Sequence, residues 1–346
     1  MSLEALAYTA NALVAEGKGI LAADESAPTI KKRFDTINVD STEGNRRFYR
    51  ELLFTTEGAG AFISGVILFD ETIRQSTEDG RSFSEVLSSQ GIIPGIKVDT
   101  GAKDLAGFPG EKVTEGLDGL RDRYAEYRDL GARFAKWRAV ITIGDGIPTP
   151  GCIQANAHAL ARYAALAQEA GLVPIVEPEV LMDGNHTIER CAEVTEVTLA
   201  AVYQELAESR VVLEGTLLKP NMVLSGNRCP TQGEVQQVAE ETIRVLKSSV
   251  PGAVPGIVFL SGGQSSELAT VHLNAMNAIG GVPWELSFSY GRALQEATLK
   301  AWGGKAANED AAQKALYHRA KCNGAARFGD YTEKMEAEAS LEIGVS

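Results

Sequence analysis

Short apolar runs and longer segments of helical periodicity alternate along the chain. The apolar runs are too short for helices and predict strands, at residues 19–23, 61–69, 93–96, 134–143, 173–176, 215–218, 256–260 and 286–288. Between them, apolar residues recur every three or four positions and predict helices, at residues 42–57, 83–89, 116–130, 155–170, 187–209, 231–249, 268–279 and 293–301. Each predicted strand is therefore followed by a predicted helix.

This alternation predicts the fold class. Strands that alternate with helices form parallel sheets, and eight such units are typical of a closed (β/α)8 TIM barrel. The spacing agrees, because one strand–helix unit separates Lys136 from Glu177 and Glu177 from Lys219. An open doubly wound sheet is less favoured, because no GxGxxG turn follows the first predicted strand. We expect a single α/β barrel domain over residues 1–346, with an extra N-terminal helix, a C-terminal helix and a mobile tail from about 320–346.

The composition excludes several classes of protein. The chain has 346 residues, of which 44% are hydrophobic and 23% charged, as in ordinary globular proteins. Its net charge of −13 disfavours binding to nucleic acid or an anionic membrane, and no apolar run is long enough for a membrane span. The four cysteines lack CxxC spacing and the four histidines lack paired ligand spacing, so we expect reduced thiols and no metal site. The N-terminus is unlike a signal or transit peptide, which predicts a cytoplasmic protein, or a plastid protein whose transit peptide has been removed.

Lys219 is the first candidate for chemistry. It follows the apolar run 215–218 and precedes Pro220, which cannot donate to a strand ladder, so the strand should end there. A lysine at the end of a buried strand loses water around its charge, which is costly unless the amine has a task. A neutral amine can attack a carbonyl and form a Schiff base. The alternative is a structural lysine whose ammonium group reaches solvent.

Other polar residues also follow the predicted strands, at the end of the barrel where such enzymes place their active sites. They are Asp24, Asp70, Lys97, Lys136, Arg138, Glu177, Glu179, Ser261 and Arg292. Because buried charges are rare without a task or a partner, this set predicts a catalytic pocket. We expect Lys136 to favour the neutral form of Lys219 by repulsion, and Glu177 and Glu179 to lie beside Lys219 and transfer protons. The alternative for both glutamates is a simple ion pair with the lysines.

Two groups of residues are suited to bind phosphate. The first lies after the seventh strand and at the end of the eighth, where barrels often bind phosphate; it comprises Ser261, Gly262, Gly263, Ser289, Gly291 and Arg292. The second would hold an anion across the mouth of the barrel; it comprises Ser26, Arg33, Lys97 and Arg138. Alternatively, the glycines only form a common turn, and the cationic side chains only form surface ion pairs.

Seven motifs carry a resemblance to a known family. They are LAADES (21–26), GIKVDTG (95–101), AKWR (135–138), VEPE (176–179), LLKPNMV (217–223), FLSGGQS (259–265) and SFSYGRALQ (287–295). Together they resemble the motifs of the class I fructose-bisphosphate aldolases, and the likeness runs over about residues 3–305. Seven motifs in order are much more specific than any one of them.

The resemblance implies a lyase without a metal or organic cofactor. It would reversibly cleave fructose 1,6-bisphosphate to dihydroxyacetone phosphate and glyceraldehyde 3-phosphate. The resemblance implies Lys219 as the Schiff-base lysine, Glu177 as the main general acid and base, and Asp24 as the residue that acts at the C4 hydroxyl. Lys136 and Glu179 are implied as supporting charges. Small sugar phosphates are the implied partners, and a homotetramer is the implied assembly.

The resemblance also implies roles for the two anion-binding groups, the first at the C1 phosphate and the second near the other phosphate. Thr29 joins the second group and stands where relatives have a serine, and Thr100 stands where many relatives have a lysine. Animal and plant members end in a tyrosine that takes part in proton transfer, whereas the last tyrosine here is Tyr331.

Two alternatives are weighed against this interpretation. One is another Schiff-base barrel aldolase or a transaldolase that acts on a monophosphate sugar, against which the second phosphate-binding group argues. The other is a barrel that binds sugar phosphates without catalysis. No residue favours it, since each candidate catalytic position holds a competent side chain.

Overall fold

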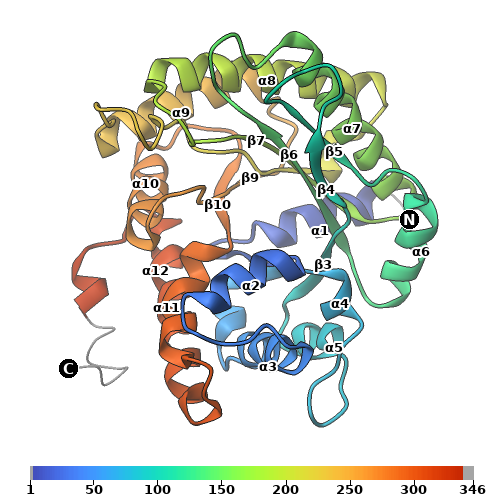
Figure 1. The fold of residues 1–346 in the computed structure, drawn as a ribbon, viewed down its shortest axis with the longest axis vertical. Helices are drawn as coiled ribbons and strands as arrows, with labels where there is room; N and C mark the ends of the chain where they lie inside the picture. The colour runs from blue at the N-terminus through green and yellow to red at the C-terminus, as the bar shows by residue number, and fades with distance from the viewer. Residues whose placement is uncertain (1–2, 338–346) are drawn as a thin grey trace.

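Eight parallel strands close into a barrel at the centre of the computed structural model (Figure 1), which describes residues 3–337. In order around the barrel they are β1 (Gly19–Ala23), β2 (Ile63–Leu68), β3 (Ile93–Lys97), β6 (Phe134–Ile141), β7 (Val173–Val180), β8 (Leu217–Leu218), β9 (Gly256–Phe259) and β10 (Glu285–Tyr290). The ring is complete because β10 pairs in parallel with β1. The predicted (β/α)8 barrel is therefore confirmed.

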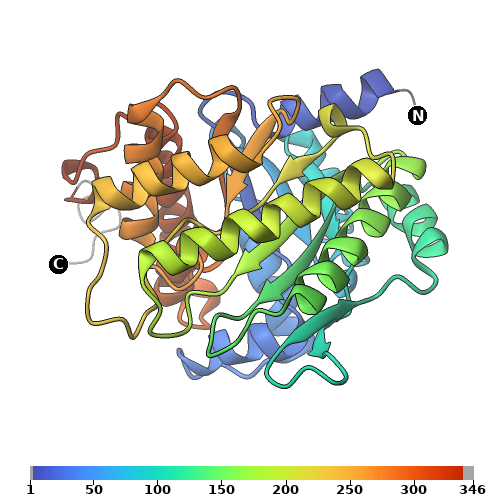
Figure 2. The ribbon, with the colours of Figure 1, turned by 90° about the horizontal axis from the view of Figure 1, so that it is seen from above.

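Helices surround the barrel (Figure 2). They are α1 (Leu3–Leu13), α2 (Ala27–Asp35), α3 (Glu43–Phe54), α4 (Asp70–Ile73), α5 (Phe83–Ser89), α6 (Leu120–Asp129), α7 (Pro150–Glu169), α8 (Ile188–Glu208), α9 (Val235–Ser249), α10 (Ser266–Ile279), α11 (Arg292–Trp302) and α12 (Glu309–Ala326). Several begin where a side-chain oxygen accepts a hydrogen bond from the backbone N–H three residues later, which satisfies a donor that the first helical turn leaves free. These capping residues are Thr42, Ser82, Thr149, Thr187 and Ser265.

The helices α2 and α4 and the strands β4 (Gly101–Asp104) and β5 (Lys112–Glu115) have no counterpart among the predicted elements. α2 has only two buried residues, Ile30 and Phe34, so its apolar periodicity is weak. The strands β4 and β5 form a separate antiparallel pair between β3 and α6. They are mostly exposed or half-buried, and therefore lack the apolar runs that marked the barrel strands.

Other elements differ in length from the prediction. β7 continues four residues beyond the predicted strand 173–176, because it pairs with β6 along its whole length, from Val173 to Val180. At the C-terminus, α12 extends to Ala326, so the first residues of the expected tail, 320–326, are helical. The last residues of that tail, 338–346, lie outside the described residues.

The interior of the barrel is closed at its amino end by α1. Leu6 and Leu13 on this helix pack against Ile20, Phe134 and Val173, which lie at or near the starts of their strands. A second and larger apolar cluster fills the space between the strands and the surrounding helices. Because apolar side chains seal the amino end, the polar residues at the carboxyl ends of the strands surround the open end.

Glycine at position 95 is required by the ring of Phe134. A Cβ atom added at Gly95 would lie 2.3 Å from carbon atoms of that ring. The Phe134 side chain therefore occupies the space that a larger residue on β3 would need, and the two strands pair side by side with Gly95 opposite Phe134.

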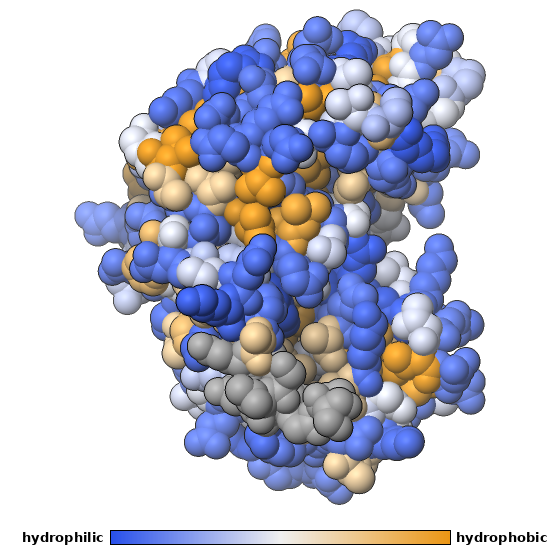
Figure 3. Space-filling view, turned by 90° about the vertical axis from the view of Figure 1, so that its left-hand side faces the viewer, coloured by the Kyte–Doolittle hydropathy of each residue, from blue (hydrophilic) through white to orange (hydrophobic). Residues whose placement is uncertain are grey.

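The surface is mainly hydrophilic. On the face drawn in Figure 3, hydrophobic residues gather in small groups among hydrophilic ones. Large apolar side chains exposed on the described part of the chain are Leu3, Tyr8, Val197, Leu268, Ile279 and Phe328. Among the described helices, none combines the length and the apolar character needed to cross a membrane.

Replacing Gly95 with alanine tests the close packing in the barrel. We expect Gly95→Ala to lower the free energy of unfolding by about 1–3 kcal/mol, because the new methyl group overlaps the Phe134 ring. Gly44→Ala is the control, since nothing lies within 4 Å of a Cβ atom at this position on α3. Urea unfolding should show no loss for Gly44→Ala, and equal effects of the two substitutions would contradict the packing described here.

Candidate active site

Lys219 lies at the mouth of the barrel, one residue beyond β8. Its backbone N–H donates a hydrogen bond of 2.8 Å to the carbonyl of Val176 on β7, so the ladder continues through Lys219 and stops at Pro220. The side chain of Lys219 is 4% exposed. The structure therefore agrees with a strand that ends at a buried lysine, and not with an ammonium group in solvent.

Four charged side chains of alternating sign form a row across the mouth. Lys219 Nζ lies 3.2 Å from Glu177 Oε1, and Glu177 Oε2 lies 3.2 Å from Lys136 Nζ. Lys136 Nζ also lies 2.7 Å from Asp24 Oδ2. The four residues come from β8, β7, β6 and the end of β1, so strands that are far apart in the sequence build one buried charge network.

The network fixes the protonation of its members. Burial alone would raise the pKa of Asp24, but the ammonium groups of Lys136 and Lys219 hold this pKa far below its ordinary value. Burial would likewise raise the pKa of Glu177, and the same two lysines lower it. Burial would lower the pKa of Lys136, yet Asp24 and Glu177 raise it well above the ordinary value. Both carboxylates are therefore ionised and Lys136 is protonated at neutral pH.

One expectation about this network needs correction, and another stays a prediction. The Glu177 carboxylate forms ion pairs with both lysines and Lys136 is also paired with Asp24, while the expected repulsion between Lys136 and Lys219 stays a prediction. Glu179 was expected beside Lys219, but its carboxylate accepts a hydrogen bond from Arg138 Nε. Glu177 and Glu179 lie two residues apart on β7, so their side chains point to the same face of the strand at different positions along it.

Arg138 belongs to a second polar group at the mouth. A cavity of about 680 Å³ is lined here by Ser26, Thr29, Lys97, Asp99 and Arg138, among other residues. Lys97 Nζ donates to Asp99 Oδ1 at 2.6 Å, and Ser26 Oγ lies 3.1 Å from Thr29 Oγ1. This cavity brings together four of the residues that the sequence placed in the second anion-binding group, namely Ser26, Thr29, Lys97 and Arg138.

Arg33 does not line this cavity, contrary to the sequence prediction. Its guanidinium lies 2.8 Å from Glu25 Oε1, and its Nη2 atom would lie 3.4 Å from a Cβ atom at Gly291. Glu25 is buried between Arg33 and Arg50, whose Nη2 lies 2.7 Å from the other carboxylate oxygen. The buried carboxylate thus holds Arg33 beside the first anion-binding group.

The first anion-binding group surrounds the ends of β9 and β10. Arg292 donates a hydrogen bond of 2.9 Å to the carbonyl of Gln264, which joins the Ser261–Gly263 turn to the N-terminus of α11. Gly262 has a φ angle of +58°, a left-handed conformation that favours glycine. Ser289 Oγ is buried without a hydrogen-bond partner within the described protein, so a donor is free there for a ligand.

Met182 is an unexpected member of this region. The N–H of Gly263 lies 2.8 Å from the Met182 sulfur, which therefore occupies a backbone donor of the turn.

Asp99 and Glu25 were also missed as partners of the cationic residues. Both acids stand in motifs that the sequence singled out, LAADES and GIKVDTG, and were detectable there; Met182 is a loop residue with no polar signal.

The two anion-binding groups lie on opposite sides of the mouth. One belongs to β9 and β10, and the other to β3, β6 and the start of α2. Around the barrel, β7 and β8 separate these strand pairs on one side, and β1 and β2 separate them on the other. In the row of charges, Lys219, Glu177 and Asp24 come from these intervening strands or their ends, and Lys136 comes from β6, which also carries Arg138.

This combination of fold and site defines a (β/α)8-barrel enzyme with a buried lysine among carboxylates at its mouth. The family model of class I fructose-bisphosphate aldolases matches residues 5–343. A probable fructose-bisphosphate aldolase class 1 from Xanthomonas campestris is 61% identical over 332 residues, which cover 96% of this chain and 99% of that protein. Fructose-bisphosphate aldolase 4, a cytosolic protein of Arabidopsis thaliana, is 57% identical over 95% of this chain and 83% of its own.

A solved structure shows the same fold. Fructose-bisphosphate aldolase from Plasmodium falciparum, crystallised with TRAP and a small-molecule inhibitor, superposes with a TM-score of 0.94 at 53% identity over 95% of both chains. The present chain therefore belongs to the class I fructose-bisphosphate aldolase family. Its function is that of this family, a carbon–carbon lyase that acts on fructose 1,6-bisphosphate, as the sequence motifs predicted.

Removing the Asp24 carboxylate tests the charge network through its pH dependence. We expect Asp24→Asn to lower the free energy of unfolding at pH 7 by about 3 kcal/mol, because Lys136 loses a partner. Since the pKa of Asp24 is lowered in the folded state, its contribution is present above about pH 4 and decreases by about 1.4 kcal/mol per pH unit below that.

Urea unfolding of the wild type and the variant at pH 7, 4 and 3 measures this difference. Asp310→Asn is the matched control, because Asp310 is exposed and pairs only with the exposed Lys314 in the described structure. A difference between wild type and Asp24→Asn that stayed constant with pH would contradict the lowered pKa.

Proposed function

We propose that Lys219 is the nucleophile of this aldolase and forms a Schiff base with the ketone carbon of fructose 1,6-bisphosphate. The observation that supports the proposal is the buried row Lys219–Glu177–Lys136–Asp24, in which the amine contacts a carboxylate at 3.2 Å. Glu177 takes a proton from Lys219, so that a neutral amine attacks the carbonyl. Glu177 then returns the proton to the carbinolamine hydroxyl, which leaves as water.

Asp24 serves the next step as a base. The protonated imine on Lys219 draws electrons from the C3–C4 bond, while the Asp24 carboxylate accepts the proton of the C4 hydroxyl. The bond breaks, glyceraldehyde 3-phosphate leaves, and an enamine remains on Lys219. Protonation of the enamine and hydrolysis release dihydroxyacetone phosphate and restore the amine. Lys136 keeps both acids ionised between turnovers, and Glu179 orients Arg138.

The two anion-binding groups bind the two phosphates. Ser261, Gly262, Gly263, Ser289, Gly291 and Arg292 hold the C1 phosphate, with Arg33 nearby, and Ser26, Thr29, Lys97 and Arg138 hold the C6 phosphate. Contacts at both ends of the substrate fix the reacting carbons against the row of charges. A ketose with one phosphate uses one group only, so the bisphosphate is the better fit. No feature of the described site favours a barrel that binds sugar phosphates without cleaving them.

Further properties follow the family resemblance. We propose that the chain acts without a metal in its catalytic step, because the protonated imine serves as the electron acceptor. A homotetramer and a cytoplasmic location are also proposed, the latter because relatives include a cytosolic plant protein and bacterial proteins; a plastid location is the alternative. Gel filtration with light scattering tests the tetramer.

Borohydride trapping tests the nucleophile. We expect incubation with fructose 1,6-bisphosphate and borohydride to leave a mass adduct on the peptide that contains Lys219, and none on the peptide that contains Lys136. Lys219→Ala should lower kcat by at least about 1,000-fold, equivalent to ~4 kcal/mol, and abolish the adduct. Cleavage that continues without an adduct would exclude the Schiff-base mechanism.

A change at Arg292 tests the proposed phosphate site. We expect Arg292→Ala to raise KM for the bisphosphate by about 10- to 100-fold, with a smaller effect on kcat, because a charge-assisted hydrogen bond is lost. Lys300→Ala is the control, since it removes an equal charge from the exposed side of the same helix. The two variants should be compared with fructose 1,6-bisphosphate and fructose 1-phosphate, and an unchanged KM in Arg292→Ala would count against this site.

A further inference from the structure

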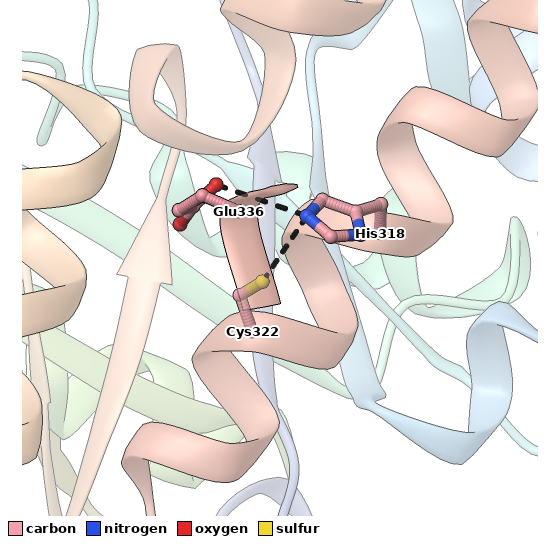
Figure 4. Close-up of side chains that lie close together, drawn as sticks. All are labelled: His318, Cys322 and Glu336. Atoms are coloured by element: carbon pink, nitrogen blue, oxygen red, sulfur yellow. Dashed lines mark hydrogen bonds and ion pairs between the residues drawn. The ribbon is translucent and has the colours of Figure 1, made fainter. Parts of the chain in front are cut away.

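Three metal-ligating side chains meet where the segment after α12 folds back on that helix (Figure 4). His318 and Cys322 lie four residues apart on α12 and therefore share one face of the helix. Glu336 comes from the segment that follows. Within residues 3–337, this is the one group of three or more such side chains whose ligand atoms all lie within 4.8 Å of one another.

The distances suit a tetrahedral metal ion. His318 Nε2 lies 3.4 Å from Cys322 Sγ and 3.7 Å from Glu336 Oε2. Ligand atoms around a tetrahedral Zn²⁺ ion lie roughly 3.3–3.6 Å apart, because the bonds to the ion are about 2.0–2.3 Å long. Small side-chain shifts are therefore enough to place all three ligand atoms at bonding distance from one ion.

The two oxygens of Glu336 have separate partners. Oε2 faces His318, whereas Oε1 accepts hydrogen bonds from Arg319 and, at 2.7 Å, from the hydroxyl of Tyr331. The backbone of Tyr331 is itself fixed, because its N–H donates to Asn274 Oδ1 at 2.8 Å. Hydrogen bonds of this kind orient the carboxylates that bind metals in proteins, and they leave Oε2 directed at the centre of the group.

The chemistry of the group selects the ion. A thiolate, an imidazole and a carboxylate together suit Zn²⁺, whereas Mg²⁺ and Ca²⁺ prefer oxygen ligands alone. A bound Zn²⁺ would balance the thiolate and carboxylate charges, and Arg319 adds a further positive charge beside Glu336. Cys322 is fully buried and His318 is 4% exposed, so the thiol is shielded from other reactants, whereas the Glu336 side chain is 26% exposed and leaves the group accessible to water.

We infer that His318, Cys322 and Glu336 form a structural Zn²⁺ site, with water as the fourth ligand, that fastens residues 327–337 to α12. Binding forms the Zn–S bond as the thiol releases its proton to solvent. Because the histidines lack paired ligand spacing, no metal site was expected from the sequence. The inferred site depends instead on a histidine–cysteine pair one helical turn apart and a glutamate from a later segment. The site is separate from the Lys219 row, and its role is to stabilise the C-terminal segment.

Metal binding by the full chain tests the inference. Protein freed of metal with a chelator should bind one Zn²⁺ per chain in calorimetric titration, and its melting temperature should rise on binding. Co²⁺ in place of Zn²⁺ should give a thiolate-to-metal charge-transfer band. We expect Cys322→Ser to abolish this band and Glu336→Gln to weaken Zn²⁺ binding at least about tenfold.

Cys229→Ser is the matched control, because it removes a different buried thiol and should change neither the band nor the affinity. Since a change at the fully buried Cys322 can disturb folding, the partly exposed Glu336 supplies a second, milder variant. Binding that is absent in the wild type, or equal in the wild type and Glu336→Gln, would overturn the site. Cleavage assayed in the same samples separates the two proposals, because metal removal should lower the melting temperature without stopping cleavage.

Discussion

A row of four buried charges at the mouth of the barrel is the constraint on which the rest of the site depends. Lys219, Glu177, Lys136 and Asp24 alternate in sign, and each has a neighbour of opposite charge within 3.2 Å. Removing one partner would leave a buried charge without compensation, which is far costlier than losing an exposed ion pair. The four residues therefore stabilise one another, and they are held in defined protonation states.

The closed barrel is what makes this row possible. Strand register determines which face each side chain takes, and a slip of β7 by one residue against β6 would turn Glu177 away from the interior. The amino end is sealed by α1 and by the fit of Phe134 against Gly95. The apolar amino end of the barrel therefore stabilises the fold, and the carboxyl ends of the same strands carry the polar residues of the site.

Much of the fold and site was predictable because the relevant signals are local. Buried parallel strands appear in the sequence as apolar runs, and the residue that ends each run lies at the same rim, so the positions of Lys219, Glu177 and Asp24 at the mouth were predictable. Weakly apolar elements such as α2 and the β4–β5 pair gave no such signal. The pairing of Arg33 with Glu25, and of Glu179 with Arg138, was also beyond the sequence.

The sequence by itself determined the number and order of the barrel units, the motifs of the family, and the residues that carry charge at the strand ends. Only the tertiary structure decided which charges of the row pair, because these partners lie at the ends of different strands and their distances depend on register and side-chain packing. The same holds for Met182 at the Gly263 N–H and for Glu336 beside His318 and Cys322. Periodicity records the face on which a residue lies, whereas a contact depends on the position of a second segment in space.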